Sequence, residues 1–150
     1  METEPVDKAV SSAAYGCFVA GLVMMVLFAL GHLGGFLQAR HAARHDPAMA
    51  DLMRAMREHR VSLMGFHPSI LDFREYFSVN FSILLLLGAA AGFAGLYVSQ
   101  DTAAAIRVLS VVYLVAMIAL LATSLIYSVA QGVVTCSVIG LLFTLAWWRA

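Results

Sequence analysis

Apolar residues in this chain form long uncharged runs, not the one-sided stripe of an amphipathic helix. The first two runs, Ala13–Leu37 and Tyr76–Ser99, contain no Asp, Glu, Lys or Arg. The hydrocarbon core of a bilayer is about 30 Å thick and takes about 20 helical residues to cross. A helix on the surface of a soluble domain keeps a charged or polar face, and these segments have no such face. We therefore predict one transmembrane helix in each run.

A third run, Val108–Trp148, continues for 41 residues without a charge. As a single helix it would be about 60 Å long, which is about twice the thickness of the hydrocarbon core. It must therefore fold back, and its most polar stretch, Tyr127–Gly132, is the predicted turn. This gives two further spans, at residues 106–127 and 129–148. The last span ends in an aromatic and basic anchor of the kind found at membrane interfaces.

The connection between the first two spans has a helical pattern of its own. Asp46 can cap a helix, and Pro47 suits the first turn that follows. Behind them, apolar side chains recur at i, i+3, i+4 and i+7, at Met49, Leu52, Met53 and Met56. This predicts an amphipathic helix over residues 47–61. It either lies at the membrane interface or packs as a soluble helix over the end of the bundle.

Together these elements predict an all-α fold: an integral membrane up-down four-helix bundle with an amphipathic interfacial helix between spans 1 and 2. Residues 1–150 are expected to form a single transmembrane domain. The composition is 62% hydrophobic and 12% charged, against about 45–50% and about 25% in soluble domains. Cys17 and Cys136 lie inside apolar runs, where we expect small buried side chains rather than a disulfide.

The distribution of charge predicts how the chain is oriented. Glu2, Glu4 and Asp7 argue against a secretory signal, which begins with basic residues. Six basic residues gather on one side of the spans, at Arg40, Arg44, Arg54, Arg57, Arg60 and Arg74. Three lie on the other side, at Lys8, Arg107 and Arg149. The positive-inside rule therefore predicts that the long loop 38–75 is cytoplasmic. A net charge of zero offers no basic face for nucleic acid.

Several polar side chains are expected to meet just inside the loop-side surface of the bundle. Three follow one another at a spacing of four residues near the start of the second span, two flank the predicted turn, and one lies near the loop end of the first span. They are His32, Asp72, Tyr76, Asn80, Tyr127 and Gln131. Polar groups inside a membrane are costly and usually face the bundle interior or water. Their convergence would make a ligand site, and it depends on the position of the turn.

We assign catalytic roles to two of these residues. Histidine is the side chain whose charge changes nearest neutral pH, so His32 could act as a general acid or base, and Asp72 could orient it. The substrate-binding set would be Tyr76, Asn80, Tyr127 and Gln131. Structural interpretations stand beside these roles. His32 could form an interhelical hydrogen bond, and Asp72 could pair with Ser69 in a helix capping box.

Histidines in the long loop raise the question of a metal. His41 and His45 are four residues apart, and His59 and His67 follow in the same loop. The sequence contains no zinc-ligand motif, and His41 and His45 lie among arginines. We therefore expect solvated histidines and no metal site. The sequence leaves any cofactor unknown.

Short stretches of the chain carry a family resemblance. They are Gly31–Gly34, Met56–Arg60 and Ser69–Phe73. On these stretches, the region Gly31–Phe81 resembles a family of small uncharacterised bacterial four-span membrane proteins, which are similar to DoxX-like proteins. The chain departs from that pattern at Ile70 and Leu71, where an aromatic pair is expected. The resemblance implies a protein of the bacterial inner membrane and points to His32 and Asp72, without implying an activity.

Three functional hypotheses follow from the sequence. The first is a membrane-embedded enzyme or binding protein that acts on a lipophilic small molecule by acid–base chemistry, as in an isomerisation or cyclisation. A hydrolase is disfavoured because the chain lacks a G-x-S-x-G motif. The second is a structural or accessory subunit of a larger membrane complex, and the third is a small transporter. The expected partners are membrane lipids, a lipophilic small molecule, and a second copy or another membrane protein.

Overall fold

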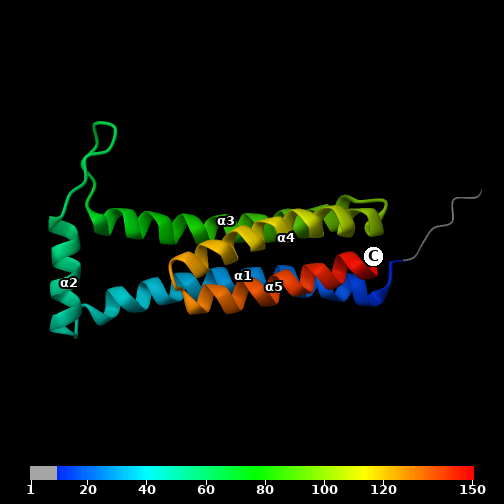
Figure 1. Ribbon diagram of the computed structural model, residues 1–150, viewed down its shortest axis with the longest axis horizontal. Helices are drawn as coiled ribbons and strands as arrows, with labels where there is room; N and C mark the ends of the chain where they lie inside the picture. Colours follow the sequence, from blue (N-terminus) through cyan, green and yellow to red (C-terminus); the bar gives the residue numbers. More distant parts are fainter. Residues whose placement is uncertain (1–9) are drawn as a thin grey trace, which may run out of the picture. The chain divides into compact units, whose positions relative to one another are not determined.

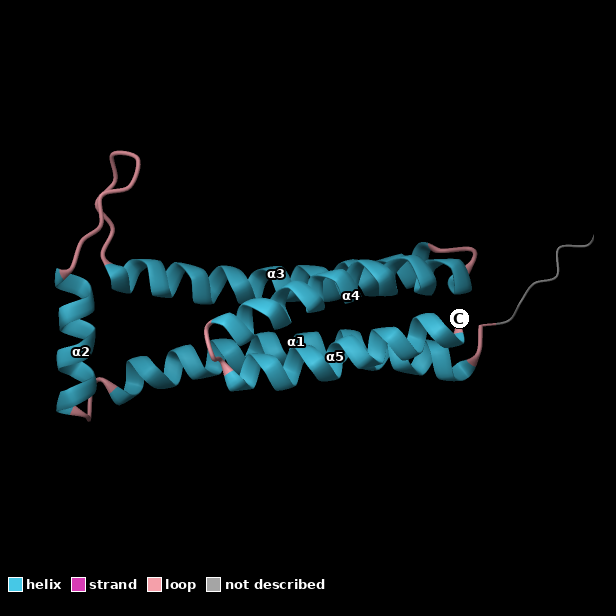
Figure 2. Cartoon of the chain, in the orientation of Figure 1, coloured by secondary structure: helices cyan, strands magenta, loops and turns pink. Residues whose placement is uncertain are grey.

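The computed structural model describes residues 10–150. The charged residues Glu2, Glu4, Asp7 and Lys8, on which the signal and orientation predictions draw, lie outside the described residues. Residues 10–150 form five helices and no strand (Figures 1 and 2). The helices are α1 (Ser12–Ala42), α2 (Pro47–Glu58), α3 (Ile70–Val98), α4 (Thr102–Ile126) and α5 (Ala130–Arg149). All but α2 are long and apolar enough to cross a membrane, which confirms the prediction of an all-α chain with four apolar spans.

Short polar side chains begin several of these helices. The Asp46 carboxylate accepts a hydrogen bond from the Ala48 amide at 2.9 Å, and Pro47 occupies the first turn, as predicted. Asp101 accepts from the Ala104 amide at 2.9 Å in the same way. Each carboxylate satisfies one of the amides that the first helical turn leaves without an intrahelical partner.

Two of the long helices extend beyond the predicted spans into flanking polar sequence. α1 continues beyond Leu37 to Ala42, and α3 begins at Ile70, ahead of the predicted start at Tyr76. Hydropathy marks only the part of a helix that suits lipid, whereas the backbone hydrogen bonds run on into polar flanks that water can solvate. α2 ends at Glu58 and not at residue 61, because the backbone is extended at His59.

α4 and α5 are joined by a tight turn at residues 127–129, inside the stretch where the sequence predicts a reversal. Ser128 adopts a φ of 54°, in the left-handed region, and the Val129 amide donates to the Ser124 carbonyl at 2.8 Å. A Cβ at Gly132 would collide with the Ser124 side chain. The absence of a side chain at Gly132 therefore allows the start of α5 to pack against the end of α4.

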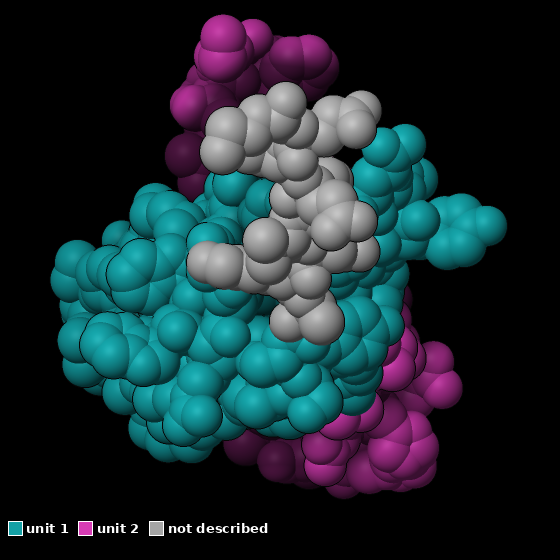
Figure 3. Space-filling view, turned by 90° about the vertical axis from the view of Figure 1, so that its right-hand side faces the viewer, with its two compact units in different colours: residues 1–25, 88–150 teal, residues 26–87 magenta. Residues whose placement is uncertain are grey.

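The described chain divides into two compact units (Figure 3). Unit 1 contains the described residues up to Met25 together with Gly88–Ala150, and unit 2 contains Val26–Leu87. Unit 1 therefore includes α4, α5 and parts of α1 and α3. Unit 2 includes α2 and the remaining parts of α1 and α3.

Aromatic rings form the core of unit 1. Phe18 of α1, Tyr113 of α4 and Phe143 of α5 lie with ring centroids 4.8–6.1 Å apart. The Tyr113 hydroxyl donates to the Gly88 carbonyl of α3 at 2.6 Å, so this cluster reaches all four long helices. Such close packing holds helices together in lipid, where burial of apolar surface away from water contributes little to association.

Candidate functional site

Unit 2 contains an open pocket of about 460 Å³. Figure 1 shows α2 running across the ends of α1 and α3, and the pocket lies where these three helices meet. Its lining residues are Arg40, Ala43, Arg44, Ala50, Met53, Arg54, Arg57, Leu71 and Glu75. We call it the arginine pocket. Its volume falls within the range of about 300–1,000 Å³ typical of small-molecule sites.

Positive charge dominates the arginine pocket, since four arginines and one glutamate line it. The glutamate, Glu75, is half-buried and accepts from Arg40, with 3.2 Å between Nε and Oε1. The Arg40 guanidinium also lies over the ring of Phe36, 5.4 Å from its centroid. This ion pair and this ring hold Arg40 in place and bind the end of α1 to the start of α3.

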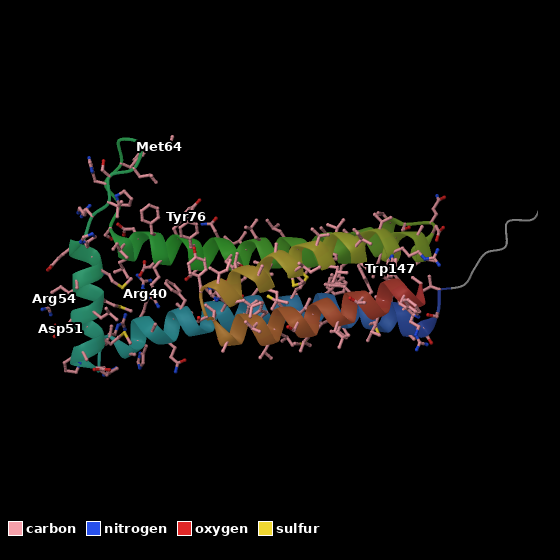
Figure 4. All side chains as sticks on the ribbon, viewed as in Figure 1. Arg40, Asp51, Arg54, Met64, Tyr76 and Trp147 are labelled. Carbon is pink, nitrogen blue, oxygen red and sulfur yellow. The ribbon has the colours of Figure 1, made fainter. Side chains whose placement is uncertain are left out.

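The other three arginines of the pocket form weaker ion pairs or none. Arg54 pairs with Asp51 across one turn of α2, at 3.3 Å between two largely exposed side chains. Exposed pairs of this kind are weak because water and salt screen them. Arg44 and Arg57 form no ion pair with any side chain among residues 10–150. Figure 4 shows Arg40 on α1 and Arg54 on α2, two of the three helices that line the pocket.

This arrangement suits an anion attached to an apolar body. A guanidinium presents a planar fork of donors that matches phosphate and carboxylate oxygens. Arg44 lies in the turn after α1 and Arg57 lies on α2, and both retain those donors for a ligand. Leu71, which is buried, and Met53 supply apolar surface in the same pocket. The chemistry favoured here is therefore recognition of an anionic amphiphile.

The predicted general base, His32, lies half-buried in the unit 2 part of α1. Its ring meets the ring of Phe81 on α3 in an edge-on geometry, with centroids 5.1 Å apart. Phe28 contacts the same Phe81 ring at 5.8 Å. These contacts give His32 an aromatic neighbour on the facing helix. The acid–base role of His32 stays a prediction.

Asp72 takes part in a capping box at the start of α3. Its carboxylate accepts from the Ser69 amide at 2.8 Å, and the Ser69 hydroxyl accepts from the Asp72 amide at 3.1 Å. Ser69 is buried, whereas Asp72 is exposed. The reciprocal bonds confirm the structural interpretation of Asp72 offered by the sequence. One carboxylate oxygen is committed to the backbone.

The four predicted substrate-binding residues divide between the two units. In unit 2, the Asn80 amide donates to the Tyr76 carbonyl at 2.9 Å, and the Tyr76 ring is largely exposed. Tyr127 and Gln131 lie in unit 1, where both are exposed. Unit 2 thus holds four of the six predicted site residues, and unit 1 holds the other two. Their binding roles stay predictions.

Histidines of the long loop form one close pair. The rings of His41 and His45 lie 4.7 Å apart at the end of α1. Across residues 10–150, no three side chains of His, Cys, Asp or Glu gather in a geometry that could hold a metal ion.

The arginine pocket was missed in the sequence, where its arginines served only to predict orientation. A usable signal was nevertheless present. Arg54 and Arg57 are three residues apart and share one face of α2, and Arg44 follows Arg40 by four residues, just beyond the end of α1. The sequence does not show that α2 directs Arg54 and Arg57 toward the end of α1.

The capping box leads to a first prediction. Ser69→Ala removes the hydroxyl that accepts from the Asp72 amide, and we expect it to destabilise the first turn of α3 by about 1 kcal/mol. Hydrogen exchange of the Asp72 and Phe73 amides should accelerate roughly fivefold. Ser62→Ala, in the exposed loop before α3, is the control and should leave both rates unchanged. Equal exchange rates in the two variants would contradict a capping role for the Ser69 hydroxyl.

Comparison with protein-family models, with curated proteins and with solved structures finds no match to this chain.

Proposed function

We propose that this chain is an integral membrane protein that binds an anionic amphiphile, such as an acidic lipid, in the arginine pocket. The four long helices would cross the bilayer as an up-down bundle, and α2 would lie along its surface. The outer surfaces of these helices support this placement. They expose large aliphatic side chains, among them Leu84, Leu87, Val108, Val115 and Leu125. Large apolar patches are rare on soluble monomers, whereas the acyl chains of a bilayer solvate exposed aliphatic side chains.

The single observation that carries the ligand proposal is the excess of guanidinium groups over carboxylates in the pocket. Arg44 and Arg57 line the pocket and form no ion pair among residues 10–150. No residue of α2, which lies at the same end of unit 2, is buried. A bound anion would neutralise this charge, and the start of its apolar tail could lie against Met53 and Leu71. Phosphate, sulfate and carboxylate groups share the required chemistry.

Orientation fits the same proposal. The positive-inside rule would place the loop of residues 38–75 in the cytoplasm, as expected for a bacterial inner-membrane protein. Anionic lipids give the cytoplasmic leaflet a negative surface potential, which attracts arginines by about 1 kcal/mol each. Acid–base chemistry at His32 and membership of the DoxX-like family remain proposals beside this one, and the capping hydrogen bonds of Asp72 favour a structural role for that residue over a catalytic one.

Binding of an acidic phospholipid tests the proposal directly. The chain is purified in neutral detergent and titrated with phosphatidylglycerol, phosphatidylcholine or inorganic phosphate, and bound lipid is counted by native mass spectrometry. We expect phosphatidylglycerol to bind more tightly than phosphatidylcholine. Arg44→Gln and Arg57→Gln should each weaken it about fivefold, which corresponds to about 1 kcal/mol per phosphate contact.

Arg74→Gln is the matched control, because it removes one positive charge from α3 outside the pocket. It should weaken binding by less than about twofold, because water and salt screen a charge outside the site. Equal losses in all three variants would refute the pocket and leave only diffuse surface attraction. Competition by inorganic phosphate would identify a free anion as the ligand, whereas its failure to compete would identify the lipid.

A further inference from the structure

The loop between α2 and α3 is a short hairpin and not an irregular coil. Antiparallel bridges pair Arg60 with Ser69 and Leu63 with Phe66. At the tip, the amides and carbonyls of Leu63 and Phe66 hydrogen-bond each other at 2.9 Å in both directions. Lower down, the Val61 amide donates to the Pro68 carbonyl at 3.0 Å. This backbone pairing gives the hairpin a defined shape that projects from unit 2 (Figure 1).

The tip of the hairpin is apolar and exposed. Met64 is 92% exposed and Phe66 75%, and Val61 and Leu63 are exposed beside them. Figure 4 places Met64 at the outer end of the hairpin. Charged residues are absent from Val61–Phe66. Four large apolar side chains on one small projection are unfavourable in water, at about 25 cal/mol for each Å² left wet.

The turn at the tip of the hairpin has Met64 at a position whose backbone conformation favours Asn or Gly. Met64 and Gly65 have φ values of 50° and 86°, the paired positive values of a type I′ turn. Asn or Gly is preferred at both positions of such a turn, and a methionine there is uncommon. The chain thus keeps a large apolar side chain at a position where a polar or small one would suit the turn better.

The base of the hairpin is joined to the start of α3. The Ile70 amide at the start of α3 donates to the His59 carbonyl at 3.0 Å, which ties the base of the hairpin to the first turn of α3. The next two turns of α3 expose the aromatic rings of Tyr76 and Phe77, which meet at 5.6 Å. Aromatic residues of this kind gather at the level of lipid headgroups.

Positive charge flanks the apolar tip, and negative charge is absent from it. The chain from His59 to Leu71 contains no acidic residue. The Arg60 guanidinium donates to the His67 carbonyl at 2.9 Å across the hairpin. Because the tip backbone is already paired, moving it out of water leaves few unsatisfied polar groups.

From these observations we infer that the Val61–Phe66 hairpin inserts its apolar tip into the headgroup–acyl boundary of the same bilayer that α3 crosses. The occupant of this surface is lipid. Arg60 lies at the level of anionic headgroups, and Met64 and Phe66 lie below it. The inference rests on the proposed membrane placement. It adds a second attachment to the bilayer, next to the arginine pocket in unit 2.

A fluorescent probe at the tip tests this contact. In a background in which Cys17 and Cys136 are replaced by alanine, Met64→Cys is labelled with an environment-sensitive dye and the full chain is reconstituted into phosphatidylglycerol–phosphatidylcholine vesicles. We expect emission at shorter wavelength than in water, and quenching by lipids that carry a spin label near the headgroup. Glu58→Cys, which lies opposite the apolar positions of α2, is the control and should give emission typical of water.

A second variant separates contact with lipid from the shape of the hairpin. Met64→Asn suits the type I′ turn and removes the apolar side chain. With the dye on Phe66→Cys, we expect quenching by the spin-labelled lipids to fall when Met64→Asn is added. Unchanged quenching would overturn the role of Met64.

The vesicle experiment also distinguishes this inference from the proposed function. Emission typical of water at position 64, in protein that resists extraction by alkaline carbonate, would overturn the hairpin inference alone and leave a protein partner as the occupant. Release of the unlabelled chain by carbonate would refute the membrane placement, and with it both proposals.

Discussion

Phe143→Ala is expected to lower the free energy of unfolding by about 3 kcal/mol, the largest effect that we predict for a single substitution. The Phe143 side chain is fully buried in unit 1 and packs against Phe18 and Tyr113, with ring centroids 5.5 and 4.8 Å away. It also lies directly over Gly21, so its removal opens a cavity between α1, α4 and α5. The loss should fall at the low end of the about 3–5 kcal/mol found for buried phenylalanines, because lipid weakens the transfer contribution.

Unfolding in mixed micelles of sodium dodecyl sulfate, followed by far-ultraviolet circular dichroism, measures this loss. Phe93→Ala is the control, since Phe93 lies on α3 within the same unit and is 39% exposed. It should cost less than about 1 kcal/mol, because no cavity forms at an exposed side chain. Similar losses for the two variants would mean that the aromatic cluster does not hold unit 1 together.

Gly92→Leu should destabilise the chain by about 2 kcal/mol, through overpacking. A Cβ at position 92 would stand 2.5 Å from the Leu22 Cδ2 atom and 2.8 Å from the Tyr113 hydroxyl. Leu22 is fully buried and cannot move aside freely. The Tyr113 hydroxyl would also have to leave the Gly88 carbonyl, which it approaches to 2.6 Å. The higher helix propensity of leucine returns only about 0.8 kcal/mol.

Gly16→Leu on α1 is the matched control for that substitution. Nothing lies within 4 Å of a Cβ at Gly16, which is exposed in the same unit. There the change should be neutral or slightly stabilising, because only helix propensity acts. The thermal midpoint in detergent should therefore fall for Gly92→Leu and hold for Gly16→Leu. A fall of the same size in both would show that close packing at Gly92 is not the cause of the loss.

The arginine pocket and the hairpin give unit 2 a common chemistry. The pocket is lined by four guanidinium groups, which would bind the proposed anion, and the hairpin exposes an apolar tip, which would lie just below the lipid headgroups in the inferred contact. Both elements adjoin the first two turns of α3, the pocket through Leu71 and Glu75 and the hairpin through Ile70. In the proposed membrane placement, a lipid bound by the pocket would enter from the same bilayer surface into which the hairpin would insert.

The sequence predicted more of the fold than of the site. The uncharged runs identified the four long helices, the period of Met49, Leu52, Met53 and Met56 identified α2, and Asp46 marked its start. The candidate site was harder to predict from the sequence, because its residues come from three helices and the turn after α1. The proposed grouping of His32 and Asp72 with Tyr127 and Gln131 relied on topology alone. Within unit 2, His32 contacts Phe81 and Asp72 is hydrogen-bonded to Ser69, and the grouping itself stays a prediction.

The sequence by itself determined which segments are helical and apolar enough to span a membrane, and where caps and turns fall. These properties depend on each residue's transfer to lipid and on hydrogen bonds within one helical turn, so neighbouring residues are enough to specify them. Only the tertiary structure decided that Arg44 and Arg57 face one pocket, and that Gly92 is packed while Gly16 is open. Those outcomes depend on how helices far apart in the chain rotate and approach one another. No local pattern encodes that geometry, because many rotations would bury an equally apolar surface.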